Sequence, residues 1–244
     1  MSAKLLLLAT LVMAIVAEST ATAATSAPAS AFAQARRTAQ ARVAALRGQH
    51  RDLDATWTET VAGPALLTGF APVVSVATAQ ATALAFAKSH ANLWGIEPEG
   101  LAVQRVVRSK AATAVHLVYS CKVGQRRAPV LDRSMTVTLD SQRAIAAVTS
   151  DMLPIAPLAA PLVSLVPAQI AVARALGLCG HGDDAKCAAV PAVQRAALAV
   201  VADMATATAV WAFDVQLAAP LDRRAVLVSA STGLVVRQTR VAID

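Results

Sequence analysis

Apolar residues recur at helix-like and then at strand-like spacing through the middle of this chain of 244 residues. Between Thr78 and Leu93 they fall mostly three, four and seven residues apart, which predicts the buried face of a helix that Gly95 ends. The runs that follow are rich in β-branched residues and bounded by polar ones, so they predict strands. These runs are Leu101–Val107, Ala114–Cys121, Met135–Leu139 and Ala144–Val148. A helix lying over an antiparallel sheet is the expected result.

The same order recurs in shorter form after a proline-rich passage with Pro154, Pro157 and Pro161. A helix is predicted from Pro167, a natural first-turn residue, to Ala175. Strands are predicted over Ala192–Val201, Ala207–Gln216 and Ala225–Val236. We therefore predict an α+β fold of two helix-on-antiparallel-sheet modules in tandem. The modules span residues 57–153 and 167–244, and residues 154–166 link them.

The start of the chain predicts export. Lys4 precedes an apolar run from Leu5 to Val16 that is too short to span a bilayer comfortably. The small residues Ala21-Thr22-Ala23 follow, as a signal peptidase site requires. We expect residues 1–23 to be a secretory signal peptide, and the mature protein to be secreted or periplasmic without a stable membrane anchor. An uncleaved anchor is the alternative.

Residues 24–56 form a basic, alanine-rich N-terminal arm with a helical stretch from Ala31 to about Gln49. Its arginines are Arg36, Arg37, Arg42, Arg47 and Arg51. They fit either a solvated helical face or an arm that binds a polyanion. The net charge of +7 otherwise comes from scattered residues with few interleaved aromatics, so together with export it argues against nucleic acid as a partner.

Composition sets the character of the core. Apolar residues make up 56% of the chain, enough for a core, but aromatic residues only 3%, so small side chains must supply most of it. The few large anchors expected are Trp57, Phe70, Phe86, Trp94, Tyr119, Trp211 and Phe213.

Two family resemblances together cover about Trp57 to Val236. The segment Gly63-Pro64-Ala65-Leu66-Leu67-Thr68-Gly69, then Ala83, Phe86 and Leu93-Trp94-Gly95-Ile96, resembles the fungalysin/thermolysin propeptide (FTP) module of secreted zinc metallopeptidases. Further on, Trp211-Ala212-Phe213-Asp214-Val215 and the run from Val226 to Val235 are similar to the closing hairpin of PepSY modules. These resemblances imply binding to a metallopeptidase. The peptidase domain that normally follows such a module is missing here, which implies action in trans or a relic of a truncated precursor.

The sequence offers no catalytic constellation. A zinc peptidase of this kind needs two histidines four residues apart on a helix, with a glutamate beside the first. The histidines are His50, His90, His116 and His181, and none is near another in sequence. A nucleophilic serine between glycines and a glycine-rich phosphate loop are also missing from the sequence. We therefore expect no enzyme activity, no catalytic residue, no metal site and no cofactor.

The one local cluster of reactive side chains runs from Cys179 to Cys187. In an exported protein the simplest interpretation is a disulfide between these two cysteines that closes a short polar loop. A metal held by Cys179, His181, Asp183 and Cys187 is the alternative. Cys121 is then unpaired. Its alternation with Val115, Leu117 and Tyr119 favours a buried small residue, and an exposed thiol that ligates a partner's zinc is the alternative.

The sequence thus predicts a noncatalytic, propeptide-like protein that binds a secreted zinc metallopeptidase as inhibitor or folding chaperone. An exposed edge strand, or the tail from Arg237 to Asp244, would lie in the peptidase cleft as an added strand. A free-standing extracytoplasmic binding module is the hypothesis from a different class.

Overall fold

The computed structural model describes residues 27–70, 78–180, 182–193, 196–204, 206–217 and 222–241. The predicted signal peptide over residues 1–23 lies outside this part of the chain, as do residues 242–244 of the predicted C-terminal tail. In the described residues, no helix is long and apolar enough to cross a membrane.

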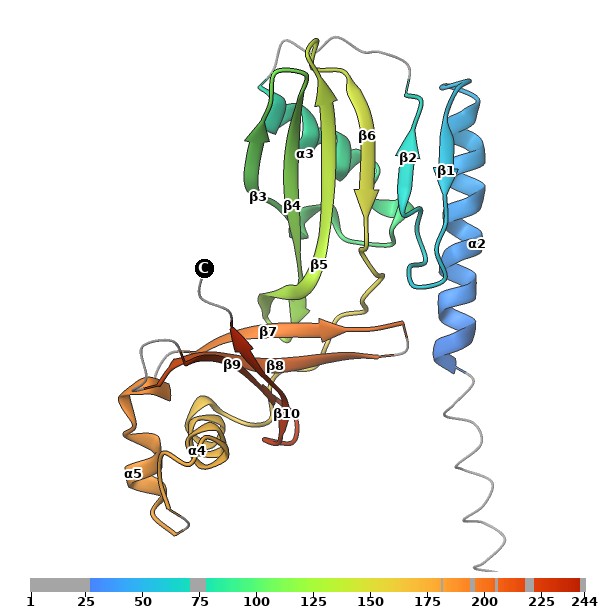
Figure 1. The fold of residues 1–244 in the computed structure, drawn as a ribbon. Coiled ribbons are helices and arrows are strands. Elements are labelled where there is room, and N and C mark those ends of the chain that lie inside the picture. Colours follow the sequence, from blue (N-terminus) through green and yellow to red (C-terminus); the bar gives the residue numbers. More distant parts are fainter. Residues whose placement is uncertain are drawn as a thin grey trace, which may run out of the picture.

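The first half forms a six-stranded antiparallel sheet in the order β1-β2-β6-β5-β4-β3 (Figure 1). The strands are β1 (Asp54–Thr56), β2 (Leu66–Thr68), β3 (Leu101–Arg108), β4 (Ala112–Val123), β5 (Arg126–Asp140) and β6 (Ile145–Ser150). Helix α3 (Ala79–Ser89) lies over one face of this sheet, followed by 3-10 turns at Ala91–Leu93 and Pro98–Gly100. The Thr78 side chain caps α3 by accepting the N–H of Ala81, and Gly95 leaves the turn with φ 65°, which favours glycine.

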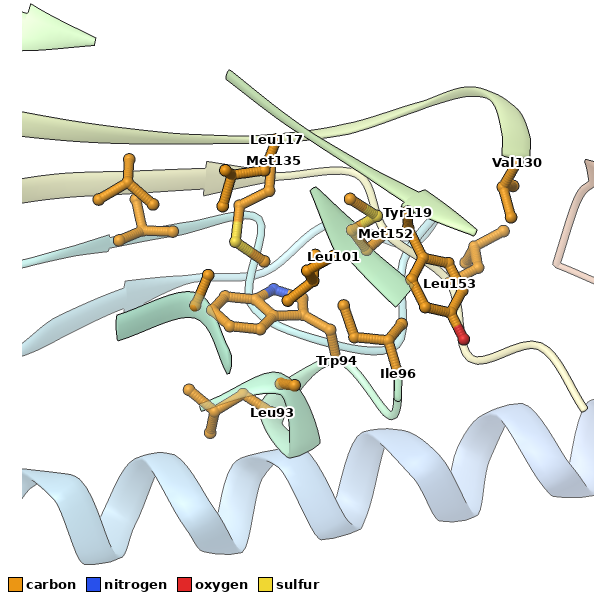
Figure 2. Close-up of a cluster of buried hydrophobic side chains, with 14 of the residues drawn as sticks. Leu93, Trp94, Ile96, Leu101, Leu117, Tyr119, Val130, Met135, Met152 and Leu153 are labelled. Atoms are coloured by element: carbon orange, nitrogen blue, oxygen red, sulfur yellow. The ribbon is translucent and has the colours of Figure 1, made fainter. Parts of the chain in front are cut away.

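Most of the predicted anchors lie in or against the core of the first half. Figure 2 shows two of them, Trp94 and Tyr119, among the buried side chains of this core. Trp94 is 1% exposed, and its Nε1–H donates to the carbonyl oxygen of Pro64 over 2.9 Å. Tyr119 is equally buried, and its hydroxyl oxygen accepts the N–H of Glu97 over 3.4 Å. These two polar contacts let large aromatic side chains enter a core that otherwise consists mostly of Ala, Val, Leu and Met.

The second half continues with helices α4 (Leu165–Ala175) and α5 (Asp184–Ala188) and a 3-10 turn at Pro191–Val193. Four antiparallel strands then follow one another in space: β7 (Ala196–Ala202), β8 (Ala207–Gln216), β9 (Arg223–Ser229) and β10 (Val235–Val241). Helix α4 packs on one face of these strands, where Val172 and Ala173 share a buried cluster with Phe213 and Val226.

The predicted arrangement of two tandem helix-on-sheet modules is wrong. About 40% of the described residues are in strands, and these strands form one large mixed sheet. The reason is β5, which begins nine residues before the predicted Met135. Its first half pairs with β4 on one side and, in parallel, with β7 on the other, where Val130 lies opposite Val200. Val130 and Val200 are both buried in the first core, so the two halves share side chains as well as backbone pairing. The fold remains a mixture of helix and strand.

Other boundaries also differ from the prediction, and the strand predicted from Ala192 begins at Ala196, after the 3-10 turn at Pro191–Val193. The run Ala225–Val236, predicted as one strand, contains the end of β9, a turn with Gly233 at φ 74°, and the start of β10. Helix α4 begins at Leu165 after Ser164, two residues before Pro167.

Helix α2 (Ala27–Arg47) corrects the interpretation of the basic arm. Ala39 and Val43 are buried, and three of the five arginines turn toward the protein and donate to backbone carbonyls. Arg36 donates to Thr58 and Val61 and lies over the Trp57 ring, Arg42 donates to Asn92, and Arg47 donates to Leu53. The helix is therefore neither a fully solvated face nor a free polyanion-binding arm.

Candidate functional site

The three histidines that the structure describes, His50, His90 and His116, do not come together at one site. The His50 and His90 rings flank the Phe70–Phe86 pair in a row of ring contacts, and His116 Nδ1 lies 3.0 Å from the Thr136 hydroxyl on the sheet. His181 lies outside the described residues. Among the residues that are described, no group of three His, Cys, Asp or Glu side chains could hold a metal ion.

The predicted Cys179–Cys187 disulfide is confirmed: the two cysteines are bonded across a sequence separation of eight residues. The bridge ties the loop after α4 to α5. Asp183, one of the alternative metal ligands, caps α5 by accepting the N–H of Lys186 over 3.1 Å and pairs with the Lys186 ammonium at 2.7 Å. The hydrogen bond from the Lys186 side chain holds the pKa of Asp183 below its ordinary value. The cysteines and the aspartate of the alternative set therefore already serve the loop itself.

Cys121 is a buried residue of the core, as the alternation of β4 predicted. It is 1% exposed and shares the covered face with Val115, Leu117 and Tyr119. Burial raises the pKa of its thiol, which keeps the reactive thiolate form scarce. A thiol that reaches a partner's zinc is incompatible with this position.

The best candidate for a functional surface is the edge strand β10. It pairs only with β9, so the backbone groups along its other edge have no strand partner in the described sheet. After a register shift between Val235 and Arg237, the pairing runs regularly from Arg237 to Val241. All residues of β10 except the half-buried Val241 are exposed, and Leu234 and Val236 beside its start are 68% and 53% exposed. Strands of this kind are templates for pairing with another chain.

The other edges of the sheet are less suited to pairing. Strand β1 has only three residues, and β3 is interrupted by a register shift between Val103 and Arg105 in its middle. Short strands and bulges are two of the ways in which proteins protect sheet edges. Strand β10 has an uninterrupted stretch of five residues without proline.

A groove of about 490 Å³ lies beside β10, on the face of β8 and β9 that α4 does not cover. Its lining includes the small or apolar side chains of Ala212, Ala225, Leu227 and Leu131. Arg237, Thr239 and Val241 of β10 form one wall.

Two ion pairs frame this groove. Arg237 pairs with Asp132 of β5 at 2.8 Å, and Arg223 donates to Asp214 through Nε at 2.7 Å and through a second nitrogen. The hydrogen bonds from Arg223 hold the pKa of Asp214 below its ordinary value. Each of these two arginines is thus balanced by an aspartate, and the groove between the ion pairs suits an uncharged side chain.

The candidate surface was only partly visible in the sequence. The prediction named an edge strand or the tail from Arg237 as the contact, but placed the last strand over Ala225–Val236 and so missed β10 itself. The residues of β10 are nearly all exposed and do not alternate between apolar and polar, so the sequence carries no periodic signal for a strand there. Gly233 was the available signal for a turn before it.

No protein-family model and no curated protein matches this chain. Among solved structures, the chain is similar to the Bacillus megaterium YpeB C-terminal domain, with a TM-score of 0.38 and 12% sequence identity, over 78% of this chain and 76% of that one. That neighbour is a PepSY-containing protein, and nothing in the comparisons supports the FTP-like resemblance. At this TM-score the likeness itself carries no argument about the fold or the function of this chain.

Proposed function

We propose that this chain is a noncatalytic protein that binds a secreted zinc metallopeptidase as an inhibitor or folding chaperone, and that it does so through β10. The observation that carries the proposal is the open edge of β10 from Arg237 to Val241, next to an apolar groove. The resemblance of Gly63–Gly69 and Leu93–Ile96 to propeptide modules supplies the class of partner.

The binding mode is strand addition. An extended segment of the partner forms main-chain hydrogen bonds with β10, and its alternate side chains point toward the face that carries the groove. Arg237, Thr239 and Val241 line the groove, so a partner side chain on the same face as these three residues would enter it. Because the rest of the lining includes Ala212, Ala225 and Leu227, an apolar side chain is the expected occupant.

The experiment mixes the purified mature protein with a secreted thermolysin-type or fungalysin-type peptidase from the same source. Cleavage of a small peptide substrate is measured across a concentration series. We expect saturable inhibition, or a higher refolding yield of denatured peptidase if the protein acts as a chaperone. Flat activity and unchanged refolding at large excess would reject this partner class and favour a free-standing binding module.

Proline substitutions test the surface itself. Neighbouring N–H groups along a strand point to opposite edges, so one of Gln238→Pro and Thr239→Pro blocks the open edge and the other breaks the pairing with β9. Thermal melting distinguishes the two variants, because only the variant that breaks the pairing with β9 should lower the melting temperature strongly. The folded variant should lose inhibition, while the better-folded of Val106→Pro and Val107→Pro on edge strand β3 should keep it. Full inhibition by every folded variant would place the contact elsewhere.

A further inference from the structure

A second pocket lies at the opposite end of the first sheet from β10. The start of α3, the β3–β4 turn and the β5–β6 turn meet at this end (Figure 1). They surround a pocket of about 390 Å³, which we call the turn pocket. Its lining residues come from three ranges: 78–79, 108–113 and 140–143.

The turn pocket has an excess of positive charge. Arg108, Lys110 and Arg143 line it, against the single carboxylate of Asp140. Arg108 and Lys110 form no ion pair with any described residue. Asp140 is engaged by its own turn, because one carboxylate oxygen accepts the N–H groups of Gln142 at 2.8 Å and Ala144 at 2.9 Å. Two of the cations that line the pocket, Arg108 and Lys110, therefore have no carboxylate partner among the described residues.

The turn that carries Arg143 is held in an uncommon conformation. Arg143 has φ 65°, a left-handed geometry that favours glycine, yet a long cationic side chain occupies this position. Besides its two side-chain bonds, the turn is closed by backbone bonds between Asp140 and Ala144 at 2.9 Å and from Arg143 to Asp140 at 3.0 Å. A costly backbone geometry is kept where the surrounding structure fixes it, and here the result is a cation beside the pocket.

The remaining donors suit an oxyanion. The hydroxyls of Ser141 and Thr113 belong to lining residues. Residues Thr78 and Ala79 at the start of the 11-residue helix α3 also line the pocket, so its positive end adds to the side-chain cations without being the basis of the site. Guanidinium groups offer paired N–H donors that match phosphate oxygens, and an ammonium adds a compact charge.

We propose that the turn pocket binds a phosphate group, either free or carried by a small molecule. The pocket shares no lining residue with the β10 groove, so this site does not depend on the proposed function.

The test is a titration of the mature protein with inorganic phosphate at pH 7 and low salt, followed by amide chemical shifts in NMR. Saturable shifts at Ala79, Ser109 and Arg143, with a dissociation constant on the order of 1 mM or tighter, are expected. A parallel titration with glycerol phosphate distinguishes the sources. Tighter binding of the ester indicates a phosphorylated small molecule, and tighter binding of inorganic phosphate indicates the free ion.

Matched variants separate a site from general attraction to a basic protein. Arg108→Gln with Lys110→Gln should weaken phosphate binding at least tenfold. Arg105→Gln with Arg126→Gln removes the same charge from exposed residues that do not line the pocket, and should change binding less than twofold. Melting temperatures confirm that both variants fold. Shifts that do not saturate, or equal weakening in the two double variants, would overturn the proposal.

Discussion

The close approach of Gly63 to Trp94 gives a quantitative test of how tightly the first core is packed. A Cβ atom on Gly63 would lie 2.4 Å from Cδ1 of the Trp94 ring and 2.8 Å from the carbonyl oxygen of Leu93. Both distances are shorter than real Cβ contacts allow. The ring has little room to move, because it is 1% exposed and its Nε1–H is held by the Pro64 carbonyl at 2.9 Å.

Gly63→Ala should therefore lower the free energy of unfolding by about 2–3 kcal/mol, the upper part of the range for overpacked cores. For a chain of this size, a loss of about 2 kcal/mol lowers the melting temperature by roughly 4–8 °C. Urea unfolding and thermal melting followed by circular dichroism measure both quantities. Gly180→Ala is the matched control, because a Cβ there meets no atom within 4 Å and the change should stay within about 0.5 kcal/mol.

A double-mutant cycle with Trp94 tests whether the contact with the indole ring causes the loss of stability in Gly63→Ala. Trp94→Leu removes the ring that the new methyl group meets first, so Gly63→Ala should cost at least about 1 kcal/mol less in that background. The Leu93 carbonyl contact remains, and some cost should persist. If Gly63→Ala were as harmless as Gly180→Ala, or if the two changes were strictly additive, the packing argument would fail.

Three further predictions concern the disulfide, one ion pair and the buried thiol. Replacing Cys179 and Cys187 by serine should cost about 2.5 kcal/mol of stability, from the loop entropy of an eight-residue closure; melting of the variant against oxidised wild type measures this. The pKa of Glu97 lies below its ordinary value of 4.5, chiefly because of the hydrogen bond from Arg127. The resulting stability is present above pH 4.5 and is lost as the pH falls through the lowered pKa. Melting curves of Glu97→Gln should accordingly depend less on pH in the acid range than those of wild type, and identical pH profiles would contradict this. Cys121 should resist alkylation at pH 8 until the protein unfolds, because its thiol is buried and its pKa is raised; rapid labelling in native buffer would count against that burial.

The parts of the fold that the sequence predicted well are those with a complete local signal. Strand β8 has the predicted bounds Ala207–Gln216. Helix α3 lies inside the predicted range, with Thr78 as its cap and Ala83 and Ala87 buried. In both, the periodicity of apolar residues agrees with the face that becomes covered.

The joining of the two halves could not be predicted in this way. The first half of β5 contains Arg126, Arg127 and Pro129, which interrupt any strand pattern. Its parallel contact with β7 joins Val130 to Val200, and a register between distant segments depends on tertiary packing that no local pattern records.

Charged residues were the other source of error. Arginines on a helix usually indicate a solvated face, yet Arg36 and Arg42 donate to carbonyls of the segments that α2 packs against. Backbone acceptors have no sequence signature, because every residue carries one. The turn pocket was hidden for a different reason, because its cations come from segments more than 30 residues apart in sequence and meet only in the folded sheet.

Strand β5 fixes the separation of the two proposed binding surfaces. Asp132, which pairs with Arg237 of β10, and Asp140, which belongs to the turn pocket, are eight residues apart on this one strand. At about 3.3 Å per residue the strand between them spans at most roughly 26 Å, and its regularly paired part from Ser134 to Asp140 alone spans about 20 Å. A phosphate group in the turn pocket therefore cannot contact a peptide strand on β10. If β5 is rigid, phosphate and a peptidase bind independently, and neither changes the dissociation constant of the other. Competition between them would require a conformational change in β5, which joins the two surfaces.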